Sequence, residues 1–193
     1  MKNTTRREAL ASIVATFGAA TVSAMTLRGN AMAATPRCTA TQPDIEGPYY
    51  LPNAPTRTSL IEPDMAGTPL DLAGTLRDLR CMPIARARIE LWQCDAHGQY
   101  DTRGSRLRAQ FETDTRGRFA LQTIVPGRYL NGPQYRPAHL HMKIWRGGRA
   151  LTTQWYFAGD PYNANDRWFR AERALTLVSQ ARGVRAQLDA VVR

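Results

Sequence analysis

The stretch Gly132-Pro133-Gln134-Tyr135-Arg136-Pro137-Ala138-His139-Leu140-His141-Met142-Lys143-Ile144-Trp145 carries two of the three histidines in a chain of 193 residues. After Pro137, small or polar residues alternate with apolar ones, which predicts a β-strand. Successive side chains of a strand point to opposite faces, so His139 and His141 share one face and can converge on a metal ion. The pair alone also fits two polar residues on a solvated face, so the surrounding sequence decides its meaning.

The same kind of alternation recurs along most of the chain and sets the fold class. Turn residues such as Asp95-Ala96-His97-Gly98 and Arg146-Gly147-Gly148-Arg149 separate the alternating segments. A short helix remains open only between residues 170 and 190. We therefore predict an all-β fold, an antiparallel β-sandwich of short strands with long loops. Its expected strands cover residues 70–78, 87–94, 109–113, 118–124, 138–145, 151–157 and 184–190.

The N-terminal 34 residues have the features of an export signal. Thr5-Arg6-Arg7-Glu8-Ala9-Leu10 is a twin-arginine pattern, residues 9–27 carry no charge, and Ala31-Met32-Ala33 offers a small-x-small cleavage site. An uncleaved membrane anchor is the alternative, but the segment is only weakly apolar. We predict a twin-arginine signal over residues 1–34, a periplasmic or secreted protein, and no stable membrane insertion after cleavage.

The remaining sequence divides by composition into two parts. Residues 35–65 are rich in Pro, Thr and Asp and predict an irregular N-terminal arm. Residues 66–193 carry the strand pattern and predict the sandwich domain. The net charge of +10 comes almost wholly from arginines, which are scattered along the chain. No nucleic-acid motif accompanies them, so we expect no nucleic-acid partner, although a basic surface attracts acidic aromatic compounds.

Three cysteines follow the signal: Cys38, Cys81 and Cys94. An exported protein is free to form disulfides, because the periplasm is oxidising. Cys81 and Cys94 flank a short segment that could run from a turn into a strand. We therefore predict that these two pair and that Cys38 stays free, with three free thiols as the alternative.

Two tyrosines stand where predicted strands end. Tyr100 follows the strand at 87–94, and Tyr129 follows Pro126-Gly127 after the strand at 118–124. Loops at strand ends often carry binding residues. Phenolate is a hard anionic donor and imidazole suits iron, so two of each give a site of charge −2 that favours Fe³⁺. By residue type alone, the other candidate tyrosines remain rivals: Tyr135, Tyr156 and Tyr162.

Several stretches together resemble the intradiol ring-cleavage dioxygenases, the family of protocatechuate 3,4-dioxygenase and catechol 1,2-dioxygenase. Each stretch is modest alone, but they occur in the family's order and span most of residues 40–165. The matching stretches are Glu46-Gly47-Pro48-Tyr49-Tyr50, residues 91–100, residues 123–129, Arg136-Pro137-Ala138-His139-Leu140-His141 and residues 151–157.

The resemblance implies a mononuclear non-haem Fe(III) site. Its ligands would be Tyr100, Tyr129, His139 and His141. It places Arg136 and Gln154 beside the substrate, and it makes Tyr129 the phenolate that substrate displaces and that then accepts a substrate proton. The implied reaction joins O2 to a small aromatic diol and cleaves the ring between the two hydroxyl-bearing carbons, giving a cis,cis-muconate-type diacid. The ring substituents and any oligomer stay open.

Two features of the chain depart from the family pattern, and one other class of protein shares part of it. The chain lacks the helical N-terminal region of the catechol-type enzymes, and Tyr135 stands where tryptophan is expected.

A non-catalytic prealbumin-like binding module is the alternative, since the pattern from Asp114 to Phe119 and Pro126 to Tyr129 also fits it. That module does not require Arg136, His139, His141 and Gln154 together, and their joint presence favours the enzyme.

Overall fold

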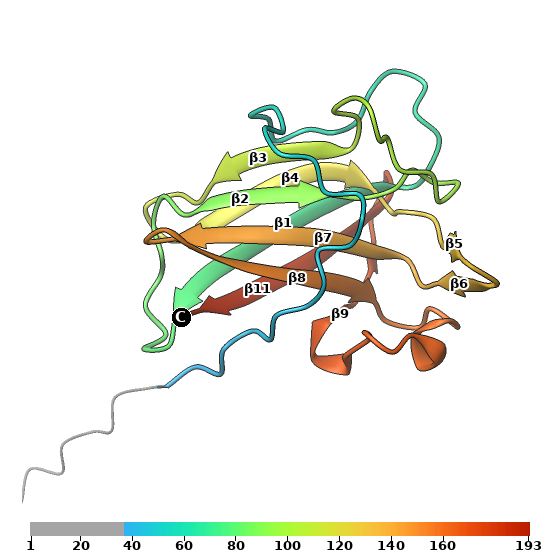
Figure 1. Ribbon diagram of the computed structural model, residues 1–193. Helices are drawn as coiled ribbons and strands as arrows, with labels where there is room; N and C mark the ends of the chain where they lie inside the picture. Colours follow the sequence, from blue (N-terminus) through green and yellow to red (C-terminus); the bar gives the residue numbers. More distant parts are fainter. Residues whose placement is uncertain (1–36) are drawn as a thin grey trace, which may run out of the picture. The chain divides into compact units, whose positions relative to one another are not determined.

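β-Strands account for nearly all of the regular structure in residues 37–193, the part of the chain that this computed structural model describes (Figure 1). The strands are β1 (Pro69–Asp78), β2 (Arg88–Trp92), β3 (Arg108–Glu112), β4 (Arg118–Ile124), β5 (Tyr129–Asn131), β6 (Gln134–Arg136), β7 (His139–Arg146), β8 (Arg149–Phe157), β9 (Ala174–Leu175), β10 (Val178–Ser179) and β11 (Val184–Val192). Two 3-10 helices are η1 (Asn163–Asn165) and η2 (Ala171–Arg173). None of the helices in this part of the chain is long and apolar enough to cross a membrane.

Two sheets form the predicted sandwich, which confirms the fold class. One sheet has the strand order β10-β11-β1-β4, the other β3-β2-β7-β8-β9, and β5 and β6 form a separate hairpin. The sheets are mixed, because β1 pairs with β11 and β8 with β9 in parallel. Neither parallel pair is joined by a tight turn, and only a tight hairpin forces its two strands to run antiparallel. The predicted antiparallel sandwich is thus found with these two parallel pairs added.

The core lies between the two sheets and follows the alternation of each strand. Leu70, Leu72 and Leu76 of β1 are buried there with Leu188 of β11. From the facing sheet, β7 contributes its even-numbered residues Leu140, Met142 and Ile144. Each such side chain gains about 1.5–3 kcal/mol by leaving water. Because β7 turns its even positions to the core, it must turn His139 and His141 to the outer face of its sheet.

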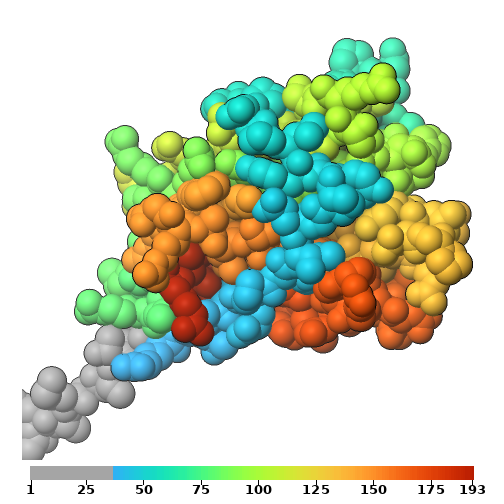
Figure 2. Space-filling model, viewed as in Figure 1, coloured from blue at the N-terminus to red at the C-terminus, as the bar shows by residue number. Residues whose placement is uncertain are grey.

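The arm, residues 37–65, lies across that outer face and along the sheet edges (Figures 1 and 2). Gln110 N of β3 donates to Pro55 O at 2.9 Å, and Leu60 N donates to Gln122 O of β4 at 2.8 Å. The Leu60 side chain is fully buried. The arm thus satisfies polar groups on two edge strands that would otherwise be open to pairing with other chains. The predicted signal lies outside the described residues, and the boundaries proposed at residues 34 and 65 stay predictions.

The disulfide joins Cys38 to Cys81, with 5.3 Å between their Cα atoms, so the predicted Cys81–Cys94 pair was wrong. Cys81 lies in the turn after β1, whereas Cys94 lies beyond the far end of β2. Five strand residues rise by about 16 Å, more than twice the Cα separation that a disulfide spans. Cys94 is instead buried, its thiol donating to Gly127 O at 3.3 Å, and burial raises the pKa of this thiol to about 12.

We predict that the Cys38→Ser/Cys81→Ser variant is less stable than wild type by about 4 kcal/mol, the chain-entropy value for a 43-residue separation. Urea unfolding measures this difference. Cys94→Ala is the control, because it removes the remaining thiol and leaves the disulfide. A reductant should lower the stability of Cys94→Ala and leave the double serine variant unchanged; equal sensitivity to reductant in the two variants contradicts the pairing.

Candidate metal centre

Strand register brings the first set of site residues together on the outer face of the five-stranded sheet. His141 of β7 is the Cα partner of Trp92 in β2 and of Gln154 in β8, and His139 is the partner of Tyr156. Partnered residues point to the same face. The Trp92 and His141 rings stack with centroids 4.9 Å apart. The rings of His139 and His141 are also 4.9 Å apart.

The β5–β6 hairpin separates the two tyrosines that the sequence left as rivals. Tyr129 is the Cα partner of Arg136, and Leu130 is the partner of Tyr135. The two pairs therefore point to opposite faces of the hairpin. Tyr129 is 9% exposed and its ring centroid lies 5.7 Å from that of His139, whereas Tyr135 is 50% exposed and lies beside Tyr162. The hairpin thus aims Tyr129 at the histidines and Tyr135 away from them.

A close contact between loops brings Tyr100 to the same place. Gly98 has φ +79°, and a Cβ there would lie 2.2 Å from the carbonyl oxygen of Arg128, so only glycine allows this approach. Tyr100 then stands with its ring centroid 5.6 Å from that of Tyr129 and 6.1 Å from that of His141. Its hydroxyl lies 3.4 Å from His139 Nε2.

The four candidate ligands, Tyr100, Tyr129, His139 and His141, therefore form one cluster of rings. Within residues 37–193 no three His, Cys, Asp or Glu side chains gather in a way that could hold a metal ion. A metal bound by side chains at this cluster must accordingly use the tyrosine oxygens. Two phenolates with two imidazoles suit a hard, highly charged ion such as Fe³⁺.

Both histidines are in the neutral state that a metal ligand needs. His139 Nδ1 donates to Pro137 O at 2.7 Å, which leaves the Nε2 lone pair free beside Tyr100. Desolvation, with the nearby Arg136 charge, lowers the pKa of His139 to about 3, and desolvation holds the pKa of His141 well below its usual value. Both imidazoles are neutral at pH 7, as metal ligands must be. His141 Nδ1 is buried and has no hydrogen-bond partner among the described residues.

Burial shifts the pKa of the Tyr100 phenol upward, opposite to its effect on the two histidines. Desolvation raises the pKa of Tyr100 well above its usual value, and the nearby Arg136 charge offsets only part of the cost of burying a phenolate. Without a metal this side chain is a neutral phenol, and its hydroxyl hydrogen faces His139 Nε2. Metal binding at this cluster would therefore release a proton from Tyr100.

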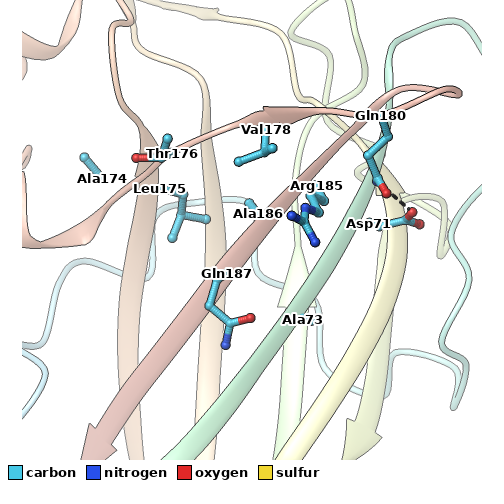
Figure 3. Close-up of a pocket in the computed structure, with 10 residues that line it drawn as sticks. All are labelled: Asp71, Ala73, Ala174, Leu175, Thr176, Val178, Gln180, Arg185, Ala186 and Gln187. Atoms are coloured by element: carbon cyan, nitrogen blue, oxygen red, sulfur yellow. Dashed lines mark hydrogen bonds between the residues drawn. The ribbon is translucent and has the colours of Figure 1, made fainter.

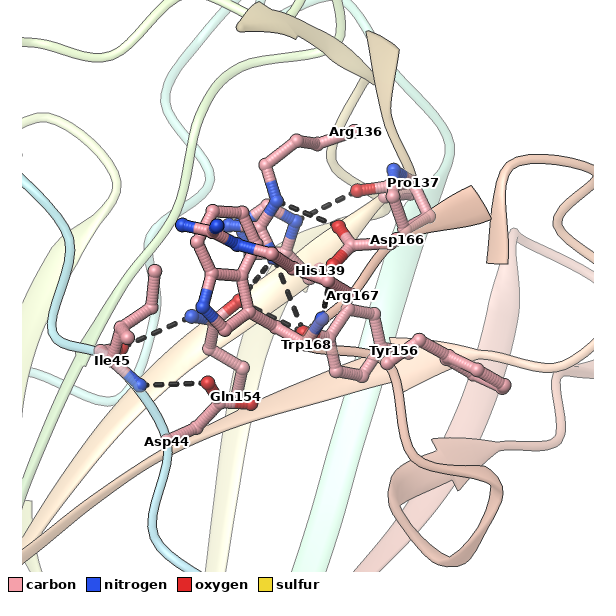
Figure 4. A network of polar contacts seen from close by, with 12 residues as sticks. Asp44, Ile45, Arg136, Pro137, His139, Gln154, Tyr156, Asp166, Arg167 and Trp168 are labelled. Atoms are coloured by element: carbon pink, nitrogen blue, oxygen red, sulfur yellow. Dashed lines mark hydrogen bonds and ion pairs between the residues drawn. The ribbon is translucent and has the colours of Figure 1, made fainter. Parts of the chain in front are cut away.

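Arg136 lies at the centre of a buried polar network (Figure 4). Its Nε donates to Asp166 at 2.7 Å, and the two side chains are 5% and 2% exposed. One terminal nitrogen donates to Gln154 Oε1 at 2.8 Å and to Tyr156 at 3.2 Å, and the other lies 3.4 Å from His139 Nε2. Burial lowers the pKa of Arg136, but Asp166, with smaller contributions from Tyr129 and Tyr156, outweighs that effect and raises the pKa overall. The guanidinium is thus held charged beside the candidate ligands.

The arm covers the cluster from outside. The Tyr49 ring stacks on Tyr100 with centroids 4.2 Å apart and meets Tyr129 edge-on at 5.8 Å. Gly47 has φ +73° and approaches His141 so closely that a Cβ there would lie 3.3 Å from the imidazole. Lys143 pairs with Glu46 and lies over the Tyr50 ring. The arm therefore excludes water from ligands that would otherwise face solvent.

Sequence reasoning missed several residues of this network. Asp166 and Trp168 come from the loop at 163–170, and the Trp168 ring lies 4.5 Å from the Arg136 guanidinium. A polar, aromatic loop after a strand was the available signal, but nothing in it identified Arg136 as the partner. Tyr156, considered only as a rival ligand, instead donates to Gln154 Oε1 at 3.1 Å, and burial raises its pKa.

A hollow of about 650 Å³ elsewhere on the molecule offers a comparison (Figure 3). It is lined by residues of β1, β10 and β11 from the four-stranded sheet and of β9 from the other sheet, and Gln180 donates to Asp71 there at 3.0 Å. Its described lining consists of small, amide and aliphatic side chains with Asp71 and Arg185, and it has no imidazole or phenol. This hollow therefore lacks the imidazole and phenol ligands that the tyrosine–histidine cluster offers.

Comparisons with known proteins identify the family of the chain. The family model described as Dioxygenase matches residues 45–190. Catechol 1,2-dioxygenase of Acinetobacter baylyi is 31% identical over 72% of this chain and 53% of its own length. This chain thus spans about half the length of the curated relatives it matches.

Two solved structures have the same fold. One is the dioxygenase domain of a dioxygenase carbohydrate-binding protein fusion from Streptomyces sp. SirexAA-E, with 37% identity and a TM-score of 0.75 over 80% of this chain and 98% of that one. The other is 3-chlorocatechol 1,2-dioxygenase of Rhodococcus opacus, with 28% identity and a TM-score of 0.74 over 78% of this chain and 71% of that one. With the family match, they show that this chain belongs to the intradiol ring-cleavage dioxygenase family.

Proposed function

We propose that the protein is a mononuclear non-haem Fe(III) dioxygenase that cleaves a small catechol between its two hydroxyl-bearing carbons. The observation that carries the proposal is the convergence of Tyr100, Tyr129, His139 and His141, with His139 Nε2 freed by the Pro137 contact. These four side chains would hold the ion. Bound Fe(III) would supply the chemistry that makes a catechol ring reactive toward O2, and both oxygen atoms would enter the cis,cis-muconate-type diacid.

Tyr129 is the ligand suited to give way to substrate. It lies on a three-residue strand of an isolated hairpin, whereas both histidines lie on the central strand β7. Rotation of the Tyr129 side chain would therefore disturb the sandwich least. A phenolate released in this way can accept a proton from a catechol hydroxyl, so Tyr129 would act as ligand in one state and as general base in the next.

Arg136 and Gln154 would act on the charge that the reaction develops. The Arg136 guanidinium lies 5.8 Å from the Tyr129 ring and 3.4 Å from His139 Nε2, beside the position that substrate oxygens would take. A fixed cation there stabilises anionic oxygen without reorganising. Gln154 would fix the orientation of Arg136, because its Oε1 accepts from Arg136 and its Nε2 donates to Ile45 O at 3.0 Å.

The prealbumin-like binding module is the less favoured function. Such a module needs the sandwich and its turns, but it gives no reason to bury two neutral histidines beside two tyrosines and a paired arginine. The family match supports the catalytic interpretation as well. A protein that binds iron without turnover is distinguished from the enzyme by the product assay below.

We also propose that the protein is exported through the twin-arginine pathway and works in the periplasm or outside the cell. The Cys38–Cys81 disulfide supports an oxidising compartment. The test is N-terminal sequencing of protein recovered from the periplasm or medium, with Arg6→Lys/Arg7→Lys as the comparison. Export of that variant at the wild-type level, or an exported protein that retains residues 1–34, overturns the proposal.

The function is tested by metal content, colour and product. Protein loaded with iron should hold one ion per chain and show a visible phenolate-to-Fe(III) charge-transfer band that shifts when a catechol is added without O2. Admission of O2 should then consume one O2 per catechol and give a product heavier by both oxygen atoms. A colourless ferric protein, stoichiometric zinc in place of iron, or a band shift without ring-opened product contradicts it.

We predict that Tyr129→Phe alters the charge-transfer band and slows catechol binding, because it removes one phenolate and the displaced base. Tyr135→Phe is the matched control on the same hairpin, and it should retain the band and most of the activity, since Tyr135 faces solvent. Absorption spectra and stopped-flow binding measure the two effects. Loss of the band in Tyr135→Phe, with retention in Tyr129→Phe, would reverse the ligand assignment.

We predict that Arg136 acts on turnover more than on iron loading. Arg136→Ala alone would leave the Asp166 carboxylate buried without its partner, which costs about 3–5 kcal/mol of stability. The Arg136→Ala/Asp166→Asn variant avoids this, and it should keep iron and colour while turnover falls by about 10²–10³-fold. Asp166→Asn alone is the control. If that control loses as much activity as the double variant, Arg136 has no separate role in turnover.

A further inference from the structure

A buried arginine of η2 links two segments that approach the site from opposite ends of the sequence. Arg173 is 3% exposed and lies beside β8. One terminal nitrogen pairs with Asp44 at 2.8 Å and donates to Trp168 O at 3.0 Å. The other donates to Thr153 Oγ1 at 3.2 Å and lies 3.4 Å from Gln42 O. A single cation thus binds the arm, β8 and the loop at 163–170.

On the arm side, the Arg173–Asp44 contact lies where the chain crosses onto the outer face of the five-stranded sheet. Asp44 N donates to Thr152 O of β8 at 2.9 Å, and the Asp44 carboxylate is 5% exposed. The carbonyl oxygen of the next residue, Ile45, accepts a hydrogen bond from Gln154 Nε2. Tyr49, which covers Tyr100, follows four residues later. The position of the Tyr49 ring over the site therefore depends on where the chain is held at Asp44.

On the loop side, the same guanidinium holds the carbonyl of Trp168. The Trp168 ring lies against Arg136 at 4.5 Å, and Trp168 N donates to Asp166, the partner of Arg136. The carbonyl contact to Arg173 therefore fixes the backbone of the segment that positions Arg136. Tyr49 stacks on Tyr100 and Trp168 lies over Arg136, and we call these two rings the walls of the site. Arg173 contacts the backbone of Trp168 and pairs with Asp44, which precedes Tyr49 on the arm.

We propose that Arg173 is a positioning residue that couples the arm to the loop at 163–170 and so sets the space in which a planar substrate binds. The proposal rests on the function proposed above. A buried ion pair is weak evidence for stability, because well-packed apolar residues often replace one without loss. The role of Arg173 is instead geometric. Its planar guanidinium contacts a carboxylate, a hydroxyl and backbone carbonyls at the same time, and the single ammonium group of lysine cannot do this.

Arg173→Lys tests the proposal, since it keeps the charge that Asp44 needs and removes the fork. Hydrogen–deuterium exchange of the iron-free variant should rise in both residues 42–50 and residues 163–170, while β1 and β11 keep wild-type protection. Iron content and the charge-transfer band of the loaded variant should be unchanged. The KM for catechol should rise about tenfold, the effect of losing one hydrogen bond to a charged group.

Arg146→Lys is the matched control at the opposite end of β7 from His139. Arg146 also pairs with an aspartate, Asp78 at 3.6 Å, and donates to a carbonyl, that of Val192 at 3.2 Å, but it touches neither wall of the site. It should leave exchange in both segments and the KM unchanged. The proposal is overturned if Arg173→Lys loosens only one segment, if it loosens β1 and β11 equally, or if the KM stays at the wild-type value in an active enzyme. Failure of wild type to cleave catechol would refute the proposed function instead, and the exchange data would still decide the coupling.

Discussion

The pleat of β7 is the constraint on which the rest of the structure depends. This strand is buried on both faces, so its alternation serves two environments at once: Leu140, Met142 and Ile144 fill the core, and His139 and His141 enter the site. A shift of register by one residue would exchange the two sets and destroy both. The energy of the apolar core therefore holds the histidines in place, and the site needs no separate framework for them.

Burial of the site's outer face follows from the arm and has an electrostatic consequence. Two buried arginines in this region have a carboxylate partner, Arg136 with Asp166 and Arg173 with Asp44. Isolated charges at such depth would cost several kcal/mol each. The two pairs also place rigid donors where they are needed, beside the candidate ligands and between the two walls. These two pairs therefore add little net charge beside the candidate ligands.

The parts of the molecule that depend on nearest neighbours in sequence could be predicted, and those that depend on long-range docking could not. Seven strands and the sharing of a face by His139 and His141 follow from a period of two. The family resemblance named Tyr129 over Tyr135, but the geometric reason needed the hairpin register, which alternation alone does not give across Pro137. The partner of Cys81 depends on where Cys38 docks, 43 residues away, and the partner of Arg136 depends on a loop with no periodic pattern. Spacing along the chain carries no information about either contact.

The arm also accounts for the selectivity that the proposed site would show among metals. A sandwich face that carried two histidines in water would leave their pKa values near normal and bind many divalent ions. Under the arm the imidazoles lose their protons readily, but the phenol of Tyr100 holds its proton more tightly. An ion must therefore supply enough charge to displace that proton before Tyr100 can become a ligand. Burial of Tyr100 would thus disfavour weakly charged ions and favour a trivalent one, so the arm that covers the cluster would also restrict which metal the proposed site binds.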